Sequence, residues 1–197
     1  TPDPLAWLET YQSLYKVPSV AGLPRFTGGL VGYFGYDTVR YIEPRLSEAS
    51  NPDPLNTPDI MLLVSDEVVV FDNLAGKLYL IVHVDPTLQN AFAVTQQRLD
   101  ELEKKLRKEI QPKAQLAKPR QVKEEDFVSE FSREKFESAV RKAKEYIVEG
   151  DVMQVVLSQR LSIAYQAESL DLYRALRSLN PSPYMYYLNL NGVHIVG

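Results

Sequence analysis

The sequence predicts an α+β fold, in which antiparallel β-sheets pack against α-helices. Two observations lead to this prediction. Runs with β-type alternation are joined by short turns, at 67–84 and 184–197, which is typical of antiparallel hairpins. Two longer stretches, 86–110 and 132–150, instead repeat apolar residues every three or four positions, as amphipathic helices do.

Composition places the chain among soluble globular proteins. Its 197 residues suit one or two domains, and 45% hydrophobic with 24% charged residues is ordinary for such proteins. A net charge of −4 without a dense basic patch gives no support for nucleic-acid binding. The absence of cysteine excludes disulfides and thiolate metal sites, and no apolar run is long enough to span a membrane. A cytoplasmic enzyme fits this composition.

The N-terminal part begins with a helix and a glycine-rich strand. Asp3 is expected to cap the helix, with Pro4 in its first turn. The stretch 26–36, FTGGLVGYFGY, has neither the Gly-Lys-Ser/Thr ending of a phosphate loop nor G-x-G-x-x-G spacing. We therefore interpret it as a strand whose glycines let another backbone approach closely. Asp37 is expected to cap a short helix that ends near Ile42, and the proline-rich residues 44–58 form a loop.

Three strands and a long helix follow. Strands are predicted at 60–64, 67–72 and 77–84, and the last two form a hairpin around the turn at 73–76. His83 is interpreted as a half-exposed residue of the third strand. The helix over 86–110 could form a coiled coil, but a helix lying on its own sheet is the better interpretation because the heptad pattern is short. The apolar positions of this helix are Leu88, Phe92, Thr95, Leu99, Leu102 and Leu106.

A second domain is predicted after an irregular linker. Residues 111–130 lack periodicity and contain scattered charge and two prolines. The predicted organisation is an N-terminal domain at 1–115, a linker at 116–130 and the beginning of a second domain at 131–197.

The second domain is predicted to begin with a capped helix and a strand. Ser132 is the expected N-cap, and Gly150 supplies the left-handed residue that ends the helix. The helix shares one apolar face among Phe136, Val140, Ala143 and Ile147. A strand is then predicted through 153–163. One of its faces carries the polar residues Gln154, Ser158, Arg160 and Ser162, with Val152 and Val156 among them. A polar row of this kind indicates contact with water or with a ligand site.

The last elements are a helix and a hairpin. Ser169 is the expected cap of the helix, which must end near Asn180 because Pro181 disfavours helical geometry in the residue before it. Strands are predicted at 184–190 and 193–197, joined by Asn191-Gly192, which is the strongest short turn signal in the chain.

Three motifs give the chain a family resemblance. EGDVMQVVLSQR at 149–160 and NPSPYMYY at 180–187 resemble the opening of the chorismate-binding domain in the anthranilate synthase component I family of chorismate-utilising enzymes. Upstream, GGLVGYFGYDTVRYIE at 28–43 is similar to the N-terminal domain of that family. The resemblance implies the family's two-domain α+β fold, truncated in the second domain. The chain begins at Thr1 without an initiator Met and stops inside a predicted strand, so we interpret it as an internal fragment.

The resemblance implies an activity for the full-length parent. Members convert chorismate and ammonia to anthranilate and pyruvate in tryptophan biosynthesis, a lyase reaction that tryptophan inhibits by feedback. A separate glutamine amidotransferase subunit supplies the ammonia. The fragment itself is expected to be inactive. Two alternatives remain: aminodeoxychorismate synthase component I of the folate pathway, and an amino-acid-binding module without catalysis.

Two candidate sites follow from the resemblance. Gln154 matches the position at which related water-adding enzymes carry a Lys, which can act as the general base that water needs. Ammonia is a competent neutral nucleophile, so Gln154 resembles the ammonia-using branch and is a candidate catalytic residue; otherwise it merely pairs with a neighbouring strand. Pro183, Tyr184 and Met185 match part of the family's tryptophan site; otherwise they form a stiff corner. The resemblance places the magnesium ligands beyond Gly197.

Overall fold

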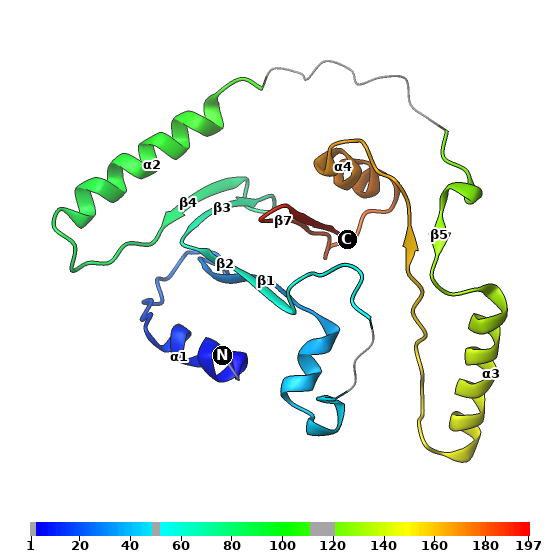
Figure 1. The fold of residues 1–197 in the computed structure, drawn as a ribbon. Coiled ribbons are helices and arrows are strands. Elements are labelled where there is room, and N and C mark those ends of the chain that lie inside the picture. The colour runs from blue at the N-terminus through cyan, green and yellow to red at the C-terminus, as the bar shows by residue number, and fades with distance from the viewer. Residues whose placement is uncertain (1–2, 49–51, 111–120) are drawn as a thin grey trace. The chain divides into compact units, whose positions relative to one another are not determined.

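The computed structural model describes residues 3–48, 52–110 and 121–197, and it confirms the α+β fold class (Figure 1). The α-helices are α1 (Pro4–Ser13), α2 (Ala91–Arg107), α3 (Arg133–Glu149) and α4 (Ser169–Leu179). The strands are β1 (Gly29–Phe34), β2 (Ile60–Ser65), β3 (Glu67–Asp72), β4 (Lys77–Val82), β5 (Val128–Ser129), β6 (Leu161–Ser162), β7 (Tyr187–Leu190) and β8 (Val193–Val196). Short 3₁₀ helices lie at η1 (Tyr36–Tyr41), η2 (Pro44–Leu46) and η3 (Glu124–Asp126).

Contacts divide the chain into two compact units. The first contains residues 1–111 together with 183–197, and the second contains residues 112–182. The C-terminal hairpin therefore groups with the N-terminal strands, because β7 contacts β2. This differs from the predicted grouping of 131–197 as one body. The predicted domain limits at 1–115, 116–130 and 131–197 refer to the family's organisation and stay a prediction.

The first unit is built from antiparallel strand pairs. β1 pairs with β2, β3 with β4, and β7 with β8. In the β1–β2 pair, Gly32 lies opposite Leu62, and a Cβ placed on Gly32 would lie 1.9 Å from the carbonyl oxygen of Met61. This contact confirms that a glycine in the 26–36 stretch permits a close backbone approach. Leu190 in β7 is fully buried and Ile81 in β4 nearly so, and these are the two buried hydrophobic side chains among the described residues.

The C-terminal hairpin has the predicted register. Asn191 and Gly192 both have positive φ, 43° and 89°, as a two-residue type I′ turn requires. Leu190 pairs with Val193, and Leu188 pairs with Ile195. Because these four residues share one face, the alternation read from the sequence is confirmed.

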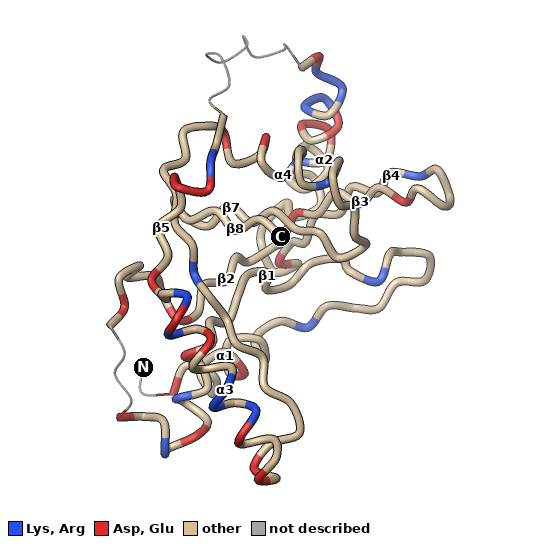
Figure 2. The backbone as a smooth tube through the Cα atoms, turned by 90° about the vertical axis from the view of Figure 1, so that its right-hand side faces the viewer, with Lys and Arg blue, Asp and Glu red and all other residues tan. Residues whose placement is uncertain are grey.

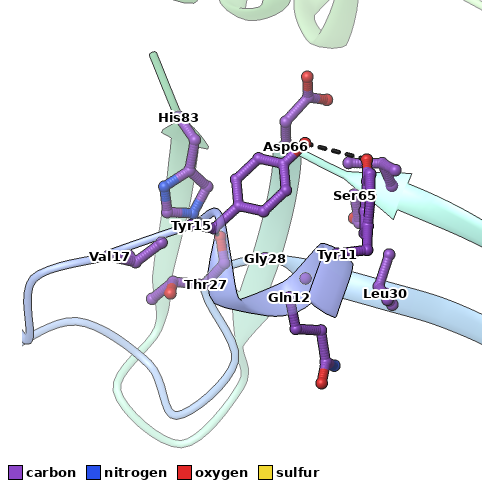
Figure 3. A pocket seen from close by; sticks show the side chains of 12 residues that line it. Tyr11, Gln12, Tyr15, Val17, Thr27, Gly28, Leu30, Ser65, Asp66 and His83 are labelled. Atoms are coloured by element: carbon purple, nitrogen blue, oxygen red, sulfur yellow. Dashed lines mark hydrogen bonds between the residues drawn. The ribbon is translucent and has the colours of Figure 1, made fainter. Parts of the chain in front are cut away.

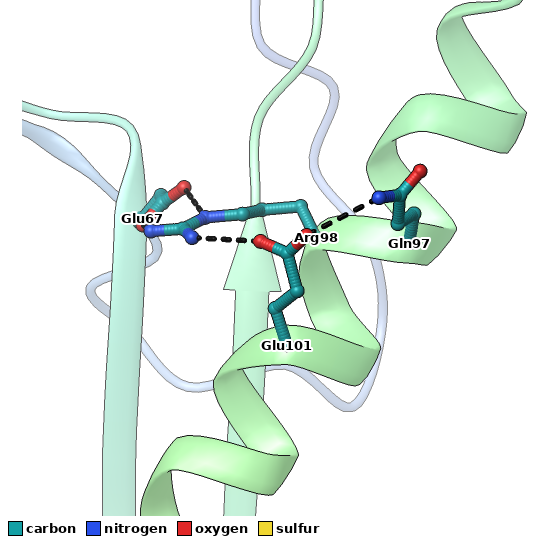
Figure 4. A network of polar contacts seen from close by, with 4 residues as sticks. All are labelled: Glu67, Gln97, Arg98 and Glu101. Atoms are coloured by element: carbon teal, nitrogen blue, oxygen red, sulfur yellow. Dashed lines mark hydrogen bonds and ion pairs between the residues drawn. The ribbon is translucent and has the colours of Figure 1, made fainter.

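Helix α2 lies on the sheet that precedes it, as predicted, and contacts β4. Arg98 joins this helix to β3 (Figure 4). Its Nε and Nη2 donate to the two carboxylate oxygens of Glu67 at 2.5 and 2.8 Å, and its Nη1 donates to Glu101 at 3.1 Å. A bidentate arginine–carboxylate pair fixes orientation as well as distance.

Replacing Arg98 should destabilise the protein at neutral pH more than in acid. The hydrogen bond from Arg98 holds the pKa of Glu67 below its usual 4.5. A carboxylate with a depressed pKa contributes stability above its unfolded pKa, and loses that contribution as the pH falls through its folded pKa. The pair is partly exposed and screened by solvent, so we expect Arg98→Met to give a small but measurable loss in the free energy of unfolding at pH 7.

Denaturant titration of the full-length protein at pH 7 and at pH 3.5 measures this effect. The difference between Arg98→Met and the wild type should shrink at the lower pH. Arg107→Met is the matched control. Arg107 pairs with Glu103 on the same helix, so this ion pair does not connect the helix to the sheet. A difference that stays constant between the two pH values would contradict the role of the Glu67 carboxylate.

The predicted helix caps are confirmed in two places. The Asp3 carboxylate accepts hydrogen bonds from the backbone N–H groups of Leu5 and Ala6, at 3.1 and 2.9 Å. Ser132 accepts from the N–H of Lys135, and Gly150 ends α3 with φ 85°. These caps satisfy backbone donors that a helix terminus would otherwise leave unpaired.

Other predicted caps and limits are wrong. Asp37 does not cap η1; its carboxylate instead pairs with Arg40 at 2.8 Å, and Gly35 holds the N-cap position. Helix α4 begins at Ser169 itself, with Glu168 as N-cap. Helix α2 begins at Ala91 rather than at Pro86, because Asp85 folds the preceding residues into a turn by accepting from Thr87.

Several predicted strands are shorter in the structure, β1 and β8 among them. β4 ends at Val82, and β7 begins at Tyr187 after a turn at 183–184. The largest difference is at 153–163, where only β6 (Leu161–Ser162) is a strand, paired with β5. A strand needs a hydrogen-bonded neighbour, and residues 153–160 have no strand partner among the described residues.

Candidate functional site

The two predicted sites lie in different compact units. Gln154 belongs to the second unit, whereas Pro183, Tyr184 and Met185 belong to the first.

Gln154 lies in the extended segment between α3 and β6. Its side chain is exposed, and it precedes the residues that tie this segment to β5. Gln159 donates from Nε2 to the hydroxyl of Ser129 at 2.8 Å, and Arg160 pairs with the Glu130 carboxylate. The segment is thus anchored at 159–162, and among the described residues Gln154 has no strand partner.

The polar row predicted from the sequence is only partly assembled. Arg160, one of its four members, is directed to Glu130, and its Nε is buried without a hydrogen-bond partner among the described atoms. Ser162 lies in β6. Gln154 and Ser158 are exposed on the same segment. Residues 151–160 of this structure therefore position Arg160 but do not enclose Gln154.

The corner at 181–185 joins α4 to β7. Helix α4 ends at Leu179, and Asn180 is its C-cap, which confirms the predicted end. Pro183 and Tyr184 form a turn, Tyr184 is 86% exposed, and Met185 is half-buried. The next residue is fixed by two backbone hydrogen bonds between Tyr186 and Gly197, at 2.8 and 3.1 Å.

Residues 183–186 of the first unit form an edge with an accessible side. The proline ring at 183 fixes one backbone φ angle, and the Tyr186–Gly197 pair fixes the residue that follows Met185. A half-buried methionine beside an exposed tyrosine offers an apolar, polarisable contact surface. Because proline already restricts this backbone, binding a ligand there would cost little further conformational entropy. Such an edge can bind a flat apolar group; it contains no acid–base pair for chemistry.

A cavity of about 210 Å³ lies elsewhere in the first unit (Figure 3). The end of α1 contributes Tyr11 and Tyr15, β1 and the residue before it contribute a backbone wall at 28–30, and His83 closes one side. Neither of the predicted sites contributes to it. Sequence reasoning missed this cavity because its walls come from four separate segments.

The polar groups of this cavity are mostly bonded to one another. The hydroxyls of Tyr11 and Tyr15 lie 2.9 Å apart, and this bond raises the pKa of Tyr11. His83 Nε2 lies 2.7 Å from the carbonyl oxygen of Thr27, and because a carbonyl only accepts, this nitrogen is the donor. His83 is half-buried, as predicted, but it lies just after β4, which ends at Val82, rather than within the strand. The cavity therefore contains no activated nucleophile.

The described part of the chain gives no support for a metal site of clustered side chains or for a membrane-spanning helix. No group of three or more His, Cys, Asp or Glu side chains in 3–48, 52–110 and 121–197 could hold a metal ion. Within the same ranges, no helix is long and apolar enough to cross a membrane. Acidic and basic residues are interspersed along α2 and α3 (Figure 2).

Comparison with known proteins gives one consistent result. Residues 1–197 match the chorismate binding enzyme family. The chain is 56% identical over 196 residues to anthranilate synthase component 1 of Pseudomonas aeruginosa, covering 99% of this chain and 40% of that protein. It is 46% identical to anthranilate synthase component 1 of Neisseria meningitidis, again over 99% of this chain and 40% of the relative.

A solved structure shares the fold. Anthranilate synthase component I from Streptococcus pneumoniae superposes with a TM-score of 0.79 at 30% sequence identity, over 99% of this chain and 43% of that chain. The present chain thus spans about two fifths of the length of these relatives, and sites in their remaining parts have no counterpart in it.

Proposed function

Because the chain belongs to the chorismate binding enzyme family, we propose that the full-length protein is the large subunit of an anthranilate synthase. In this proposal it converts chorismate and ammonia to anthranilate and pyruvate in tryptophan biosynthesis in the cytoplasm, with tryptophan as inhibitor. A glutamine amidotransferase subunit supplies the ammonia. The observation that carries the proposal is 56% identity to a relative of this name across 99% of the chain.

The alternatives from the sequence are less well supported. The relatives reported above carry the name of anthranilate synthase, which favours this activity over aminodeoxychorismate synthase. A purely amino-acid-binding module is disfavoured because the match to a chorismate binding enzyme family extends over the whole chain. Anthranilate and 4-amino-4-deoxychorismate differ in fluorescence and mass, so the product formed by the full-length protein from chorismate and ammonium distinguishes the two enzymes.

Gln154 has a chemical role in this proposal. Ammonia attacks through its own lone pair and needs no general base, whereas water must lose a proton. An uncharged amide can bind a nucleophile or a substrate oxygen by hydrogen bonds without taking up its proton. Gln154 would therefore orient a reactant rather than activate one.

Magnesium is proposed as a cofactor whose ligands lie outside this chain. The described residues do not gather enough carboxylates to hold it, so the residues present do not fit a magnesium site. The part played by this chain is the segment around Gln154 and the corner at 183–185.

Replacing Gln154 should slow the reaction without unfolding the protein. Gln154→Ala in the full-length enzyme removes one hydrogen-bonding amide, so we expect ammonia-dependent turnover to fall about tenfold. The initial rate of anthranilate formation at saturating chorismate measures the effect. Gln166→Ala is the matched control, since Gln166 is another exposed glutamine of the same unit. Equal turnover in wild type and Gln154→Ala would remove Gln154 from the site.

The chain of 197 residues is expected to be inactive by itself. It spans 40% of its relatives and lacks a candidate magnesium site among its described residues. Incubation with chorismate, magnesium and excess ammonium should produce no anthranilate fluorescence above the protein-free background. Fluorescence that grows in proportion to the concentration of the purified chain would contradict this expectation.

A further inference from the structure

The cavity beside His83 has room for a small molecule. Its volume is about 210 Å³, and Val17, Leu30 and Val64 line it together with the rings of Tyr11 and Tyr15 (Figure 3). An apolar cavity of about 150 Å³ is already large enough to bind benzene. This cavity therefore fits a single aromatic ring that carries a small substituent.

One wall of the cavity is the end of an aromatic ladder on α1. Trp7, Tyr11 and Tyr15 follow at intervals of four residues, and the ring centroids lie 5.3 Å apart at both steps. The ladder ends at Tyr15, which is 55% exposed although it lines the cavity. Aromatic rings associate by offset stacking or by edge-to-face contact. Tyr15 thus presents an uncovered ring against which a further aromatic ring can pack.

The polar groups of the cavity provide one hydrogen-bond donor. The hydroxyls of Tyr11 and Tyr15 are joined by one hydrogen bond, and neither hydroxyl makes another in the described part of the chain. Each hydroxyl carries one hydrogen, so one of the two hydrogens remains for a further acceptor. The Nε2 hydrogen of His83 is already donated to the carbonyl oxygen of Thr27. A ligand with an acceptor oxygen can accept from the tyrosine pair.

The charges around the cavity disfavour an anion. Asp66 lines it, and neither lysine nor arginine is among the described residues that do so. Burying a carboxylate without a cation to pair with it carries a large desolvation penalty. Chorismate, anthranilate and tryptophan all carry carboxylates, so the substrate, the product and the inhibitor of the proposed function do not suit this cavity.

We propose that this cavity binds a small, neutral aromatic molecule with an acceptor oxygen, as in a phenol or an aryl ether. The ring of the ligand packs against Tyr15, and its oxygen accepts from the hydroxyl pair. The ligand then contacts α1, the backbone at 28–30 and His83 together, and so stabilises the folded first unit. Neither Gln154 nor the corner at 183–185 lines the cavity, which makes it a site in addition to those of the proposed function.

Fluorine NMR of 4-fluorophenol with the full-length protein tests the site, with ammonium and magnesium left out to prevent turnover. We expect saturable binding with a Kd at or below about 1 mM. Binding should persist in saturating chorismate and tryptophan. The matched probe 4-fluorobenzoate, which carries a carboxylate, should bind at least about tenfold more weakly. The proposal is overturned by a lack of saturable binding, by displacement with chorismate or tryptophan, or by equal affinity for the two probes.

Tyr15→Ser locates the bound probe. This variant removes the ring that the ligand contacts, and because Tyr15 is more than half exposed the fold should tolerate the change. The Kd of 4-fluorophenol should rise at least about tenfold. Tyr36→Ser is the matched control and should leave the Kd unchanged, since Tyr36 is 91% exposed in the same unit and does not line the cavity.

An unchanged Kd in Tyr15→Ser would overturn the proposal, because the probe would then occupy another place. Formation of anthranilate is a separate measurement, so the cavity site and the proposed function can fail independently.

Discussion

Gly32→Ala is expected to be the most destabilising single substitution considered for this chain. The added Cβ would lie 1.9 Å from the carbonyl oxygen of Met61 and 2.9 Å from the Cα of Leu62. Both contacts are with backbone, so no side-chain rotation can relieve them. The β1–β2 pair must separate, which weakens its ladder, and we expect a loss of about 2–4 kcal/mol in the free energy of unfolding.

The loss can be measured as a lower denaturation midpoint of the full-length protein. Gly35→Ala is the matched control: it lies just after the same strand, at φ −65°, and its Cβ would meet only the backbone of Asp59, at 3.1 Å or more. Its effect should be below about 1 kcal/mol, since a shift of a few tenths of an ångström accommodates it. Equal midpoints for Gly32→Ala and the wild type would show that β1 and β2 do not approach this closely in the full-length protein.

Met185→Gln should weaken inhibition by tryptophan about tenfold to a hundredfold in the full-length enzyme. The proposed effector contacts the apolar edge formed by Pro183 and Met185, and losing one good apolar contact costs about 1–3 kcal/mol. An effector acts by binding one of two conformations more tightly, not by lying near the reaction. The edge is suited to this because Met185 is half-buried just before the first strand of the β7–β8 hairpin.

Two titrations separate an effector site from an active site. Initial rate against chorismate should change little in Met185→Gln, whereas inhibition by tryptophan should require a higher concentration. Leu74→Gln is the control for a generic apolar-to-amide change, because Leu74 is fully exposed in the β3–β4 turn. If Met185→Gln loses turnover in step with inhibitor affinity, Met185 belongs to the core or to the catalytic site instead.

Local sequence signals predicted much of this fold. The Asn191-Gly192 turn determined the register of the β7–β8 pair, since a two-residue loop leaves no freedom to slip. Asp3, Ser132 and Gly150 predicted helix ends because capping depends on neighbouring residues alone. Asp37 failed as a cap because an arginine three residues later competes for its carboxylate, and acidic residues near a helix start have several possible partners.

Long-range features could not be predicted in the same way. Three features join segments that are distant in sequence: the pairing of β1 with β2, the Arg98–Glu67 bridge and the cavity beside His83. The spacing of apolar residues along one segment carries no information about such long-range pairs. The strand at 153–163 shows the converse. Its alternation predicted a strand, but in the structure only Leu161–Ser162 is one, because alternation does not supply the neighbour that a strand requires. Gln154 and Met185 were recognised by family resemblance, and their roles stay predictions.

The contact between β2 and β7 has a consequence for synthesis. These strands are separated by about 120 residues of sequence, so at 5–20 residues per second β2 leaves the ribosome roughly 6–24 seconds before β7 exists. During that interval the surface of the first unit that later receives Leu190 stays uncovered. Nascent chains of this protein should therefore depend on chaperones until the hairpin arrives, and translation pauses between β2 and β7 should increase aggregation.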